Sequence, residues 1–256
     1  MGFLKALTLA VGLIGFGFFA FVCALVILPL IPFFPGLRFR LNSLFIKPFS
    51  LFARAVVGIK LVILNSEKGR IHRPSFMVGN HQTGLDFALI SQACPAGLVI
   101  VGKKEIQNIP IFGWFFWIAG NLLINRSDKT GAKAKIDEVK KRLGKYQLNL
   151  AIFPEGTRSK TSEFLPFKKG AFYLGVSTGY PVVPVVCSRL KGKGIWETFD
   201  LSGGHVVISI LDPMETEHLS GADLPAFTER VRNLMIDEYA RVNKIADEMD
   251  LNERHR

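Results

Sequence analysis

The sequence has few cysteines and no metal-binding arrangement of them. Cys23, Cys94 and Cys187 are far apart in apolar surroundings, and neither a C-x-x-C pair nor a Cys/His cluster occurs. Isolated cysteines of this kind are typical of small buried side chains in a reducing compartment. The sequence therefore predicts no disulfide framework and no metal site.

A recognisable enzyme nucleophile is also lacking. The sequence has one Gly-x-Ser-x-Gly pattern, Gly175-Val176-Ser177-Thr178-Gly179, but it precedes an expected strand, whereas a nucleophile turn follows one. Its cysteines stand in apolar surroundings. A catalytic base in this chain would therefore have to activate a hydroxyl group of a substrate, or water.

Acidic residues are in the minority. The 21 Asp and Glu stand against 32 Lys and Arg, which gives a net charge of +11 and requires a negatively charged partner. Clusters of about five to eight basic residues are missing. Most Phe lie in apolar runs rather than among cations, where they could stack on bases. We therefore expect an anionic membrane and a phosphorylated substrate as partners, and no nucleic acid.

No charged residue occurs between Lys5 and Arg38. A bilayer-spanning helix needs about 20 apolar residues, and this stretch is too long for the apolar core of a secretory signal. Residues 6–37 are thus expected to anchor the chain, either by spanning the membrane or by dipping into it as a hairpin. Cations follow the segment whereas only Lys5 precedes it, so the positive-inside rule places the bulk of the chain in the cytoplasm.

Two parts of the chain differ in pattern. Residues 39–58 mix apolar residues with spaced cations, which fits a helix in the membrane interface or an ordinary amphipathic helix packed on the domain. We therefore assign residues 1–60 to a membrane-anchoring helical segment and residues 61–256 to the main domain.

Short apolar runs alternate with helical patterns beyond Ser75, which predicts an α/β fold with a largely parallel or mixed sheet flanked by helices. A basic helix is expected at Lys133–Tyr146 and a last helix from Phe227 to Val242, followed by a polar tail at Glu248–Arg256. The expected strands are Phe76–Val78, Leu98–Val101, Leu122–Ile124, Leu148–Phe153, Val182–Val186 and Val206–Leu211.

The first candidate site is Asn80-His81-Gln82-Thr83-Gly84-Leu85-Asp86, directly after an expected strand. A His oriented by a carboxylate is the base half of a triad-like device. On a continuous helix the two side chains would lie about 140° apart, so the chain must turn between them. The alternative is structural, because Thr83-x-x-Asp86 also reads as a helix-capping box.

The second candidate site is Phe153-Pro154-Glu155-Gly156-Thr157-Arg158-Ser159, after the expected strand Leu148–Phe153. Gly156 lets backbone amides approach an anion, Thr157 adds a hydroxyl, and Arg158 can hold a phosphate bidentately. Glu155 would be out of place beside a phosphate unless it orients Arg158 or a neighbouring backbone. The alternative is a solvated basic loop.

A third region combines Lys103, Lys104 and Glu105 with the aromatic segment Ile109–Trp117. Two Trp and three Phe beside cations suit a membrane interface or an acyl-chain groove. Ordinary core aromatics are the alternative.

In combination these segments resemble the glycerolipid acyltransferases with the H-x-x-x-x-D signature, and most closely their bacterial 1-acylglycerol-3-phosphate acyltransferases. The resemblance runs from about Ser75 to Cys187. It rests on Asn80–Asp86, Lys104-Glu105, Asn121–Arg126, Phe153–Ser159, Phe167–Ala171 and Val182–Val186.

The resemblance implies acyl transfer from acyl-CoA or acyl carrier protein to the 2-hydroxyl of lysophosphatidic acid at the inner membrane. His81 would be the base and Asp86 its partner, with no metal or bound cofactor and the acyl donor as cosubstrate. The implied substrate-binding residues are Lys104, Arg126, Glu155, Gly156, Thr157 and Arg158. The family's second motif usually reads Ile-Asp-Arg, whereas this chain has Asn125 before Arg126, a change that bears on acceptor preference.

Three rival functions remain on sequence alone. The acceptor could be another lysophospholipid, or His81 could activate water in a thioester or phosphate hydrolase. A non-enzymatic alternative is a basic membrane tether.

Overall fold

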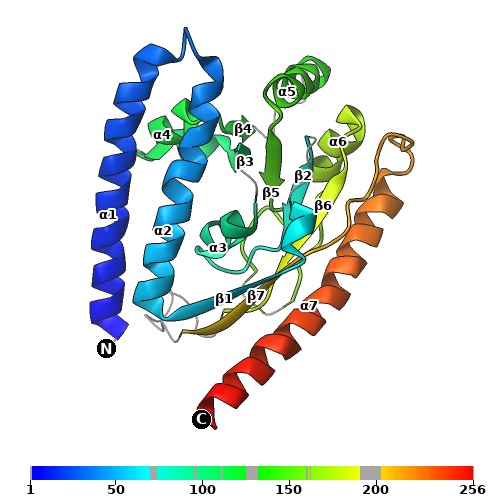
Figure 1. Ribbon diagram of the computed structural model, residues 1–256. Coiled ribbons are helices and arrows are strands. Elements are labelled where there is room, and N and C mark those ends of the chain that lie inside the picture. Colours follow the sequence, from blue (N-terminus) through cyan, green and yellow to red (C-terminus); the bar gives the residue numbers. More distant parts are fainter. Residues whose placement is uncertain are drawn as a thin grey trace.

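The computed structural model describes residues 2–69, 74–94, 97–110, 112–124, 132–159, 161, 163–190 and 203–255. They form a central sheet with helices on both faces, so the predicted α/β class is confirmed (Figure 1). The helix pair at the N-terminus lies along one side of the sheet. The long C-terminal helix crosses the other side.

Within the described residues, seven strands form one sheet in the order β1-β7-β6-β2-β5-β3-β4. Neighbours are parallel except β6 and β7, which are antiparallel, so the β1–β7 pair runs against the other five strands. The strands are β1 (Ile59–Leu64), β2 (Phe76–Gly79), β3 (Leu98–Lys103), β4 (Leu122–Ile124), β5 (Asn149–Ile152), β6 (Val182–Cys187) and β7 (Gly204–Ile210).

The helices divide between the two faces. Helices α2 and α3 cover one face, α5, α6 and α7 cover the other, and α4 packs beside α1. The α-helices are α1 (Gly2–Ile27), α2 (Leu41–Val57), α3 (Asp86–Ala93), α4 (Phe112–Ile118), α5 (Ala132–Tyr146), α6 (Lys169–Thr178) and α7 (Leu224–Arg254). The 3-10 helices are η1 (Leu28–Leu30), η2 (Pro35–Arg40), η3 (Ser66–Gly69) and η4 (Lys104–Asn108).

The strand residues supply both hydrophobic cores. Alternate side chains of a strand point to opposite faces. Phe76 and Val78 of β2 therefore lie under α5, α6 and α7, whereas Met77 between them lies on the side of α2 and α3. Burial on both faces explains why the strands read as continuous apolar runs.

Helices α1 and α2 form a hairpin, joined by η1 and η2 (Figure 1). Edge-to-face ring contacts join the two helices, with centroids 5.9 Å apart for Phe16–Phe49 and 5.7 Å for Phe19–Phe45. Helix α2 also packs against α3 and β1, as expected of an amphipathic helix on the domain, although Leu44 and Leu51 stay exposed.

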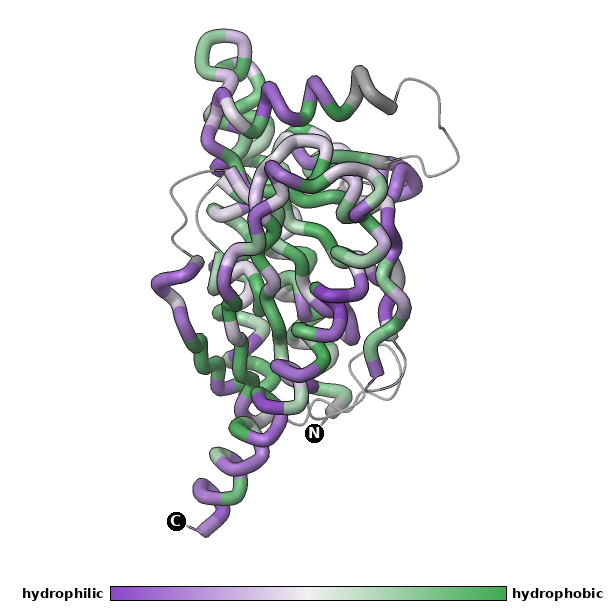
Figure 2. Tube along the Cα trace, turned by 90° about the vertical axis from the view of Figure 1, so that its right-hand side faces the viewer, coloured by the Kyte–Doolittle hydropathy of each residue, from purple (hydrophilic) through white to green (hydrophobic). Residues whose placement is uncertain are grey.

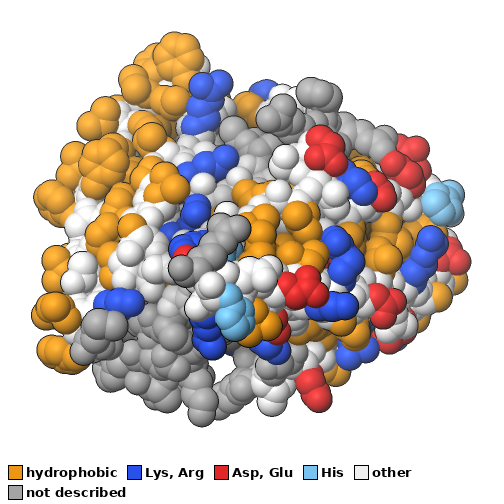
Figure 3. All heavy atoms as spheres, turned by 60° about the horizontal axis from the view of Figure 1, so that its bottom comes forward, with side chains coloured by type: hydrophobic (Ala, Val, Ile, Leu, Met, Phe, Trp, Pro, Cys, Tyr) orange, Lys and Arg blue, Asp and Glu red, His pale blue; other side chains and the backbone are white. Residues whose placement is uncertain are grey.

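The outer face of this hairpin is apolar and exposed (Figure 3). Within the described residues, Phe3–Leu30 is the one segment long and apolar enough to cross a membrane, judged by length and composition. This agrees with the expected apolar anchor. Exposed residues of α1 and its following turn include Phe3, Leu7, Val11, Ile14, Phe18, Val22, Val26, Leu28, Phe33 and Phe34.

Two parts of the chain differ from what the sequence predicts, one at the edge of the sheet and one at the C-terminus. Strand β1 begins at Ile59, so the sheet starts slightly before the expected domain boundary after residue 60. The expected polar tail was wrong, because α7 continues to Arg254. Residues 251–255 after the buried Asp250 are exposed, and the end of the helix projects from the body (Figure 2).

An ion-pair network fastens the end of α7 to β7 and β1. The ring Nδ1 of His205 lies 2.6 Å from Asp250 Oδ1, and the His205 amide donates to the same oxygen at 2.9 Å. Lys60 pairs with Glu253, whose other oxygen lies 3.9 Å from the His205 ring. We interpret this network as a clamp: although it contains ligand-type groups, each of them has a protein partner.

The sheet also fixes where a site can form. The chain leaves the adjacent strands β2 and β5 toward opposite faces, into α3 on one side and α6 on the other. Such a topological switch point is where open α/β sheets bind ligands, beyond the carboxyl ends of the strands.

Candidate active site

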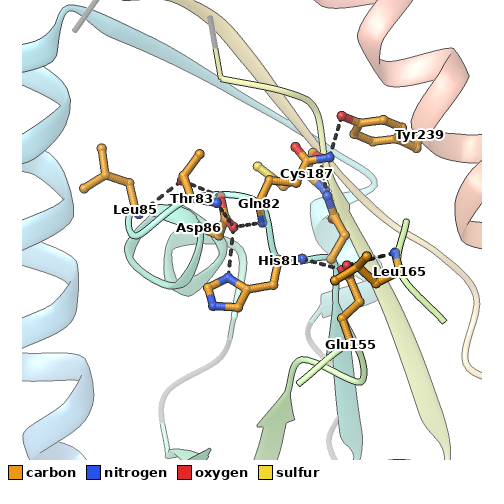
Figure 4. A network of polar contacts seen from close by, with 10 residues as sticks. His81, Gln82, Thr83, Leu85, Asp86, Glu155, Leu165, Cys187 and Tyr239 are labelled. Atoms are coloured by element: carbon orange, nitrogen blue, oxygen red, sulfur yellow. Dashed lines mark hydrogen bonds and ion pairs between the residues drawn. The ribbon is translucent and has the colours of Figure 1, made fainter. Parts of the chain in front are cut away.

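His81 and Asp86 come together in the loop after β2 (Figure 4). The Nδ1 of His81 lies 3.1 Å from Asp86 Oδ2. The chain turns over residues 83–85, and α3 begins at Asp86, so the two side chains can face each other. The turn that this contact requires is therefore present. The contact leaves the other ring nitrogen, Nε2, on the side of the imidazole away from Asp86.

The Asp86 carboxylate also organises the loop itself. It accepts hydrogen bonds from the backbone amides of Gln82 and Thr83, the second at 2.6 Å, and from the Thr83 hydroxyl at 2.7 Å. The capping box does not form as such, because the N-cap residue of α3 is Leu85 and it has no side-chain capping bond, whereas the bonded amides lie in the loop before it. A carboxylate in the first turn is still favoured by the helix dipole, so the buried Asp86 both closes the loop and orients the histidine.

Phe153 holds the plane of the His81 ring. The two rings stack with centroids 4.3 Å apart and an interplanar angle of 15°, and Phe87 packs edge-on against Phe153. Phe153 follows β5 directly and is the first residue of the second candidate segment. The second segment therefore packs against His81 of the first segment. Stacking and the Asp86 bond together fix the ring in one orientation.

Glu155 ties the two segments together through the backbone. Its Oε1 accepts from the His81 amide at 2.8 Å and its Oε2 from the Leu165 amide at 3.1 Å. The residue is only 2% exposed, and this burial raises the pKa of Glu155, partly offset by the two amide bonds. Both carboxylate oxygens are thus engaged by backbone, which is one of the two roles the sequence left open for this residue.

The rest of the second segment runs past His81 to the rim of the site. The Ser159 amide donates to the His81 carbonyl at 2.8 Å. Gly156 has a φ of 71°, in the left-handed region where glycine is favoured, and it bends the chain after Pro154. Thr157 and Arg158 are exposed, one or two residues from the Ser159 contact.

Two anchoring residues escaped the sequence analysis. The buried Asn80 amide makes reciprocal bonds to the backbone of Cys187, at 2.9 Å and 2.8 Å, and so fixes the loop to the end of β6. Gln82 donates to the hydroxyl of Tyr239 on α7 at 2.5 Å. The only local signal for Asn80 is its place before His81. Tyr239, which is far away in sequence, has no such signal.

The remaining expected site residues are less closely joined to His81. Lys104 is exposed in η4, at the carboxyl end of β3 and hence at the same edge of the sheet as the His81 loop. Arg126 and Asn125 lie outside the described residues.

Two of the three cysteines, Cys94 and Cys187, are poorly suited to act as nucleophiles. Cys94 and Cys187 are buried free thiols. Burial raises the pKa of Cys94 to about 12 and the pKa of Cys187 well above its usual value. A thiol is reactive as the thiolate, so neither side chain provides an activated nucleophile at neutral pH.

Comparison with known proteins places this arrangement in a family. A family model described as Acyltransferase matches residues 60–188. A 1-acyl-sn-glycerol-3-phosphate acyltransferase of Saccharomyces cerevisiae is 30% identical over 237 residues, 92% of this chain and 76% of the yeast protein. The protein of the same name from Escherichia coli is 31% identical over 187 residues, 73% of this chain and 76% of that protein.

A solved structure supports the fold. The crystal structure of a 1-acyl-sn-glycerophosphate acyltransferase from Thermotoga maritima aligns with a TM-score of 0.61 at 23% identity, over 87% of this chain and 95% of that one. At this identity the likeness is evidence for the fold alone. The family match and the two relatives carry the assignment further: the chain is an enzyme that belongs to the acyltransferase family of the 1-acyl-sn-glycerol-3-phosphate acyltransferases.

Proposed function

We propose that the protein transfers an acyl group from acyl-CoA or acyl carrier protein to the free 2-hydroxyl of 1-acylglycerol-3-phosphate, giving phosphatidic acid. The observation that carries the proposal is the His81–Asp86 pair, 3.1 Å apart at the switch point of the sheet in a chain of this family. The names of the relatives support the acceptor.

His81 is the general base of the proposed reaction. Asp86 holds the Nδ1–H, so Nε2 is free to take the proton of the acceptor hydroxyl. The hydroxyl oxygen attacks the thioester carbonyl, the C–S bond breaks, and the leaving thiolate takes the proton back from the imidazolium. A positioned base of this kind contributes about 10²–10⁴-fold to a rate.

No covalent acyl-enzyme is needed in this scheme. The thioester is already activated, and the buried cysteines have raised pKa values that oppose thiolate formation. The acyl donor is a cosubstrate, and the scheme uses no metal or bound cofactor. Backbone amides or Lys104 at the end of β3 would stabilise the oxyanion.

The segment after β5 is assigned to the acceptor phosphate. Arg158 and Thr157 are exposed beside the His81 loop, and Gly156 allows close approach of backbone amides. Arg126 is proposed as a second cation for the substrates. Glu155 is a positioning residue, because its two oxygens hold the amides of His81 and Leu165.

Membrane association through the N-terminal hairpin would bring both substrates to the site. Helix α1 packs on α2 along one face and leaves its other face apolar and exposed, so we propose that the hairpin inserts as a unit rather than as an isolated spanning helix. The excess of cations after residue 37 favours a catalytic domain on the cytoplasmic side of the inner membrane.

The test is formation of labelled phosphatidic acid from radiolabelled palmitoyl-CoA and lysophosphatidic acid in detergent micelles, with thiol release followed in parallel. We expect equal amounts of thiol and product, and neither without acceptor. Thiol release without acceptor would establish a hydrolase instead. Preference for lysophosphatidylethanolamine or lysophosphatidylglycerol would replace the proposed acceptor. Loaded acyl carrier protein tests the other donor.

A further inference from the structure

The short helix α4 has two faces of opposite character. Phe115, Phe116 and Ile118 are buried, whereas Trp114 is 69% exposed and Trp117 is 61% exposed. The two Trp stand three residues apart and thus on the same side of the helix. Ile109, just before α4, is also exposed. The aromatic segment is therefore partly core and partly surface. Neither ordinary core aromatics nor a membrane interface or acyl-chain groove alone accounts for all of its described side chains.

The buried face of α4 fixes it to the N-terminal hairpin. Phe115 meets Phe45 of α2 edge-to-face with centroids 4.9 Å apart, and it shares a hydrophobic cluster with Ala20 and Ala24 of α1 and Leu41 of α2. Helix α4 and the hairpin consequently form one packed unit.

The exposed face of α4 is continuous with that of the hairpin. A groove of about 650 Å³ lies between them, with Leu28 of η1 on one side and Trp114, Trp117 and Ile118 on the other. Leu28 directly follows the exposed apolar face of α1. Polar Gln107 and Asn108 line a further part of the same groove. Figure 3 shows hydrophobic side chains gathered on the side of the molecule where the hairpin lies in Figure 1.

A cation stands at the border of this surface. Arg38 donates from Nη2 to the Trp117 carbonyl at 2.7 Å and from Nε to the Ile118 carbonyl at 3.1 Å, so it caps the last turn of α4. Its guanidinium carbon lies 5.8 Å from the centre of the Trp117 ring. Tryptophan with a neighbouring Arg or Lys is the combination enriched where a protein meets lipid headgroups.

We propose that α4 is a second membrane-contact element, with Trp114 and Trp117 at the boundary between headgroups and acyl chains of an anionic bilayer. The inference rests on the proposed membrane association, and it specifies how deeply the protein is inserted in the bilayer. Helix α4 follows β3 and η4, where Lys104 stands at the edge of the sheet that carries the His81 loop. The depth of the two Trp therefore fixes how close the site lies to the lipid surface.

The test uses tryptophan fluorescence of the full chain. Trp196 is the third tryptophan of the sequence, so Trp196→Phe leaves Trp114 and Trp117 as the reporters. The probe is a vesicle of phosphatidylcholine and phosphatidylglycerol whose chains carry bromine near the headgroup or near the chain end. We expect quenching by both lipids, stronger with shallow bromine, and the same order in each single-Trp variant obtained with Trp114→Phe or Trp117→Phe.

Vesicle flotation separates this inference from the proposed function. Trp114→Ser with Trp117→Ser is expected to weaken vesicle binding at least about tenfold, because each ring removes a large apolar area from water. Tyr173→Ser on α6, an exposed aromatic away from the hairpin, is the matched control and should bind like wild type. Binding without quenching would overturn the role of α4 alone. Failure of the wild type to float would overturn the hairpin and α4 together, whereas acyl transfer in micelles tests the reaction independently.

Discussion

Among the residues that the structure describes, two histidines are paired with aspartates, and the pairs occupy different settings. His81 and Asp86 lie 3.1 Å apart, and His205 and Asp250 lie 2.6 Å apart. In both pairs the side chains are largely buried. Distance and burial therefore do not tell which pair performs catalysis.

The surroundings of the two pairs do differ. His81 sits in a loop beyond the carboxyl end of β2, stacked on Phe153 and bordered by the segment that carries Arg158. His205 sits on the regular strand β7 beneath the end of α7, next to the Lys60–Glu253 pair. A His–Asp pair can thus orient a base or fasten a helix, and its place on the sheet decides between these uses.

Removing the negative charge of the His81–Asp86 pair should reduce the rate of acyl transfer more than any change outside this pair that is considered below. Asp86→Asn keeps the size of the side chain but cannot stabilise the imidazolium that forms when His81 takes a proton. We expect the rate constant of acceptor-dependent transfer to fall about 10²–10⁴-fold. The measurement is initial thiol release at saturating substrates, with the circular dichroism spectrum as the folding control. A rate within about threefold of wild type would remove Asp86 from the mechanism.

The next effect concerns substrate binding rather than the base. Arg158→Ala should raise the KM for lysophosphatidic acid about 10- to 100-fold, since a hydrogen bond to a charged group contributes about 1.5–3 kcal/mol. The turnover number should change little. Arg230→Ala on α7, an exposed cation outside the loop, is the control and should leave KM unchanged. An unchanged KM in Arg158→Ala would place the phosphate elsewhere.

Glu155 offers a test by pH. Burial raises its folded-state pKa above the ordinary value of 4.5. As the pH rises, the carboxyl group therefore loses its proton first in the unfolded chain. The contribution of Glu155 to stability is complete below its ordinary pKa of 4.5 and is lost as the pH rises through the higher folded-state pKa. The melting temperature of the wild type minus that of Glu155→Gln should thus be largest in acid and should decrease as the pH rises toward neutral. A difference that is constant with pH would contradict the raised pKa.

The second pair should affect stability and leave catalysis intact. His205→Ala removes both ring contacts of the clamp and leaves the buried Asp250 with fewer donors. The free energy of unfolding should fall by about 1–3 kcal/mol, which lowers the melting temperature by a few degrees. Thermal denaturation measures this effect. If the melting temperature is unchanged, His205 does not clamp α7.

Local patterns were enough to predict much of the site. The expected strands at Phe76–Val78 and Leu148–Phe153 are present as β2 and β5, because buried parallel strands are continuous apolar runs. A contact between His81 and Asp86 required a turn between them, and the structure has that turn at residues 83–85. Glu155 was recognised as unusual for a phosphate loop, and the structure supplies the backbone partners.

Long-range contacts were out of reach of the sequence. Tyr239 meets Gln82 across 157 positions, and Asp250 meets His205 across 45, and no periodicity signals either. The polar end of α7 read as a tail because its partners, Lys60 and His205, lie on other elements. Strand β1 was overlooked although a helix stop precedes it, because Gly58 ends α2 with a φ of 83° directly before Ile59.

The most direct test of the account compares His81→Ala with His205→Ala at equal concentrations in micelles, by thiol release from palmitoyl-CoA with and without lysophosphatidic acid. We expect His81→Ala to lose acceptor-dependent release by at least about 10²-fold, whereas His205→Ala should retain it to within about twofold below its melting temperature. Retained release in His81→Ala, or an equal loss in both variants, would contradict the claim that His81 is the base and His205 a clamp.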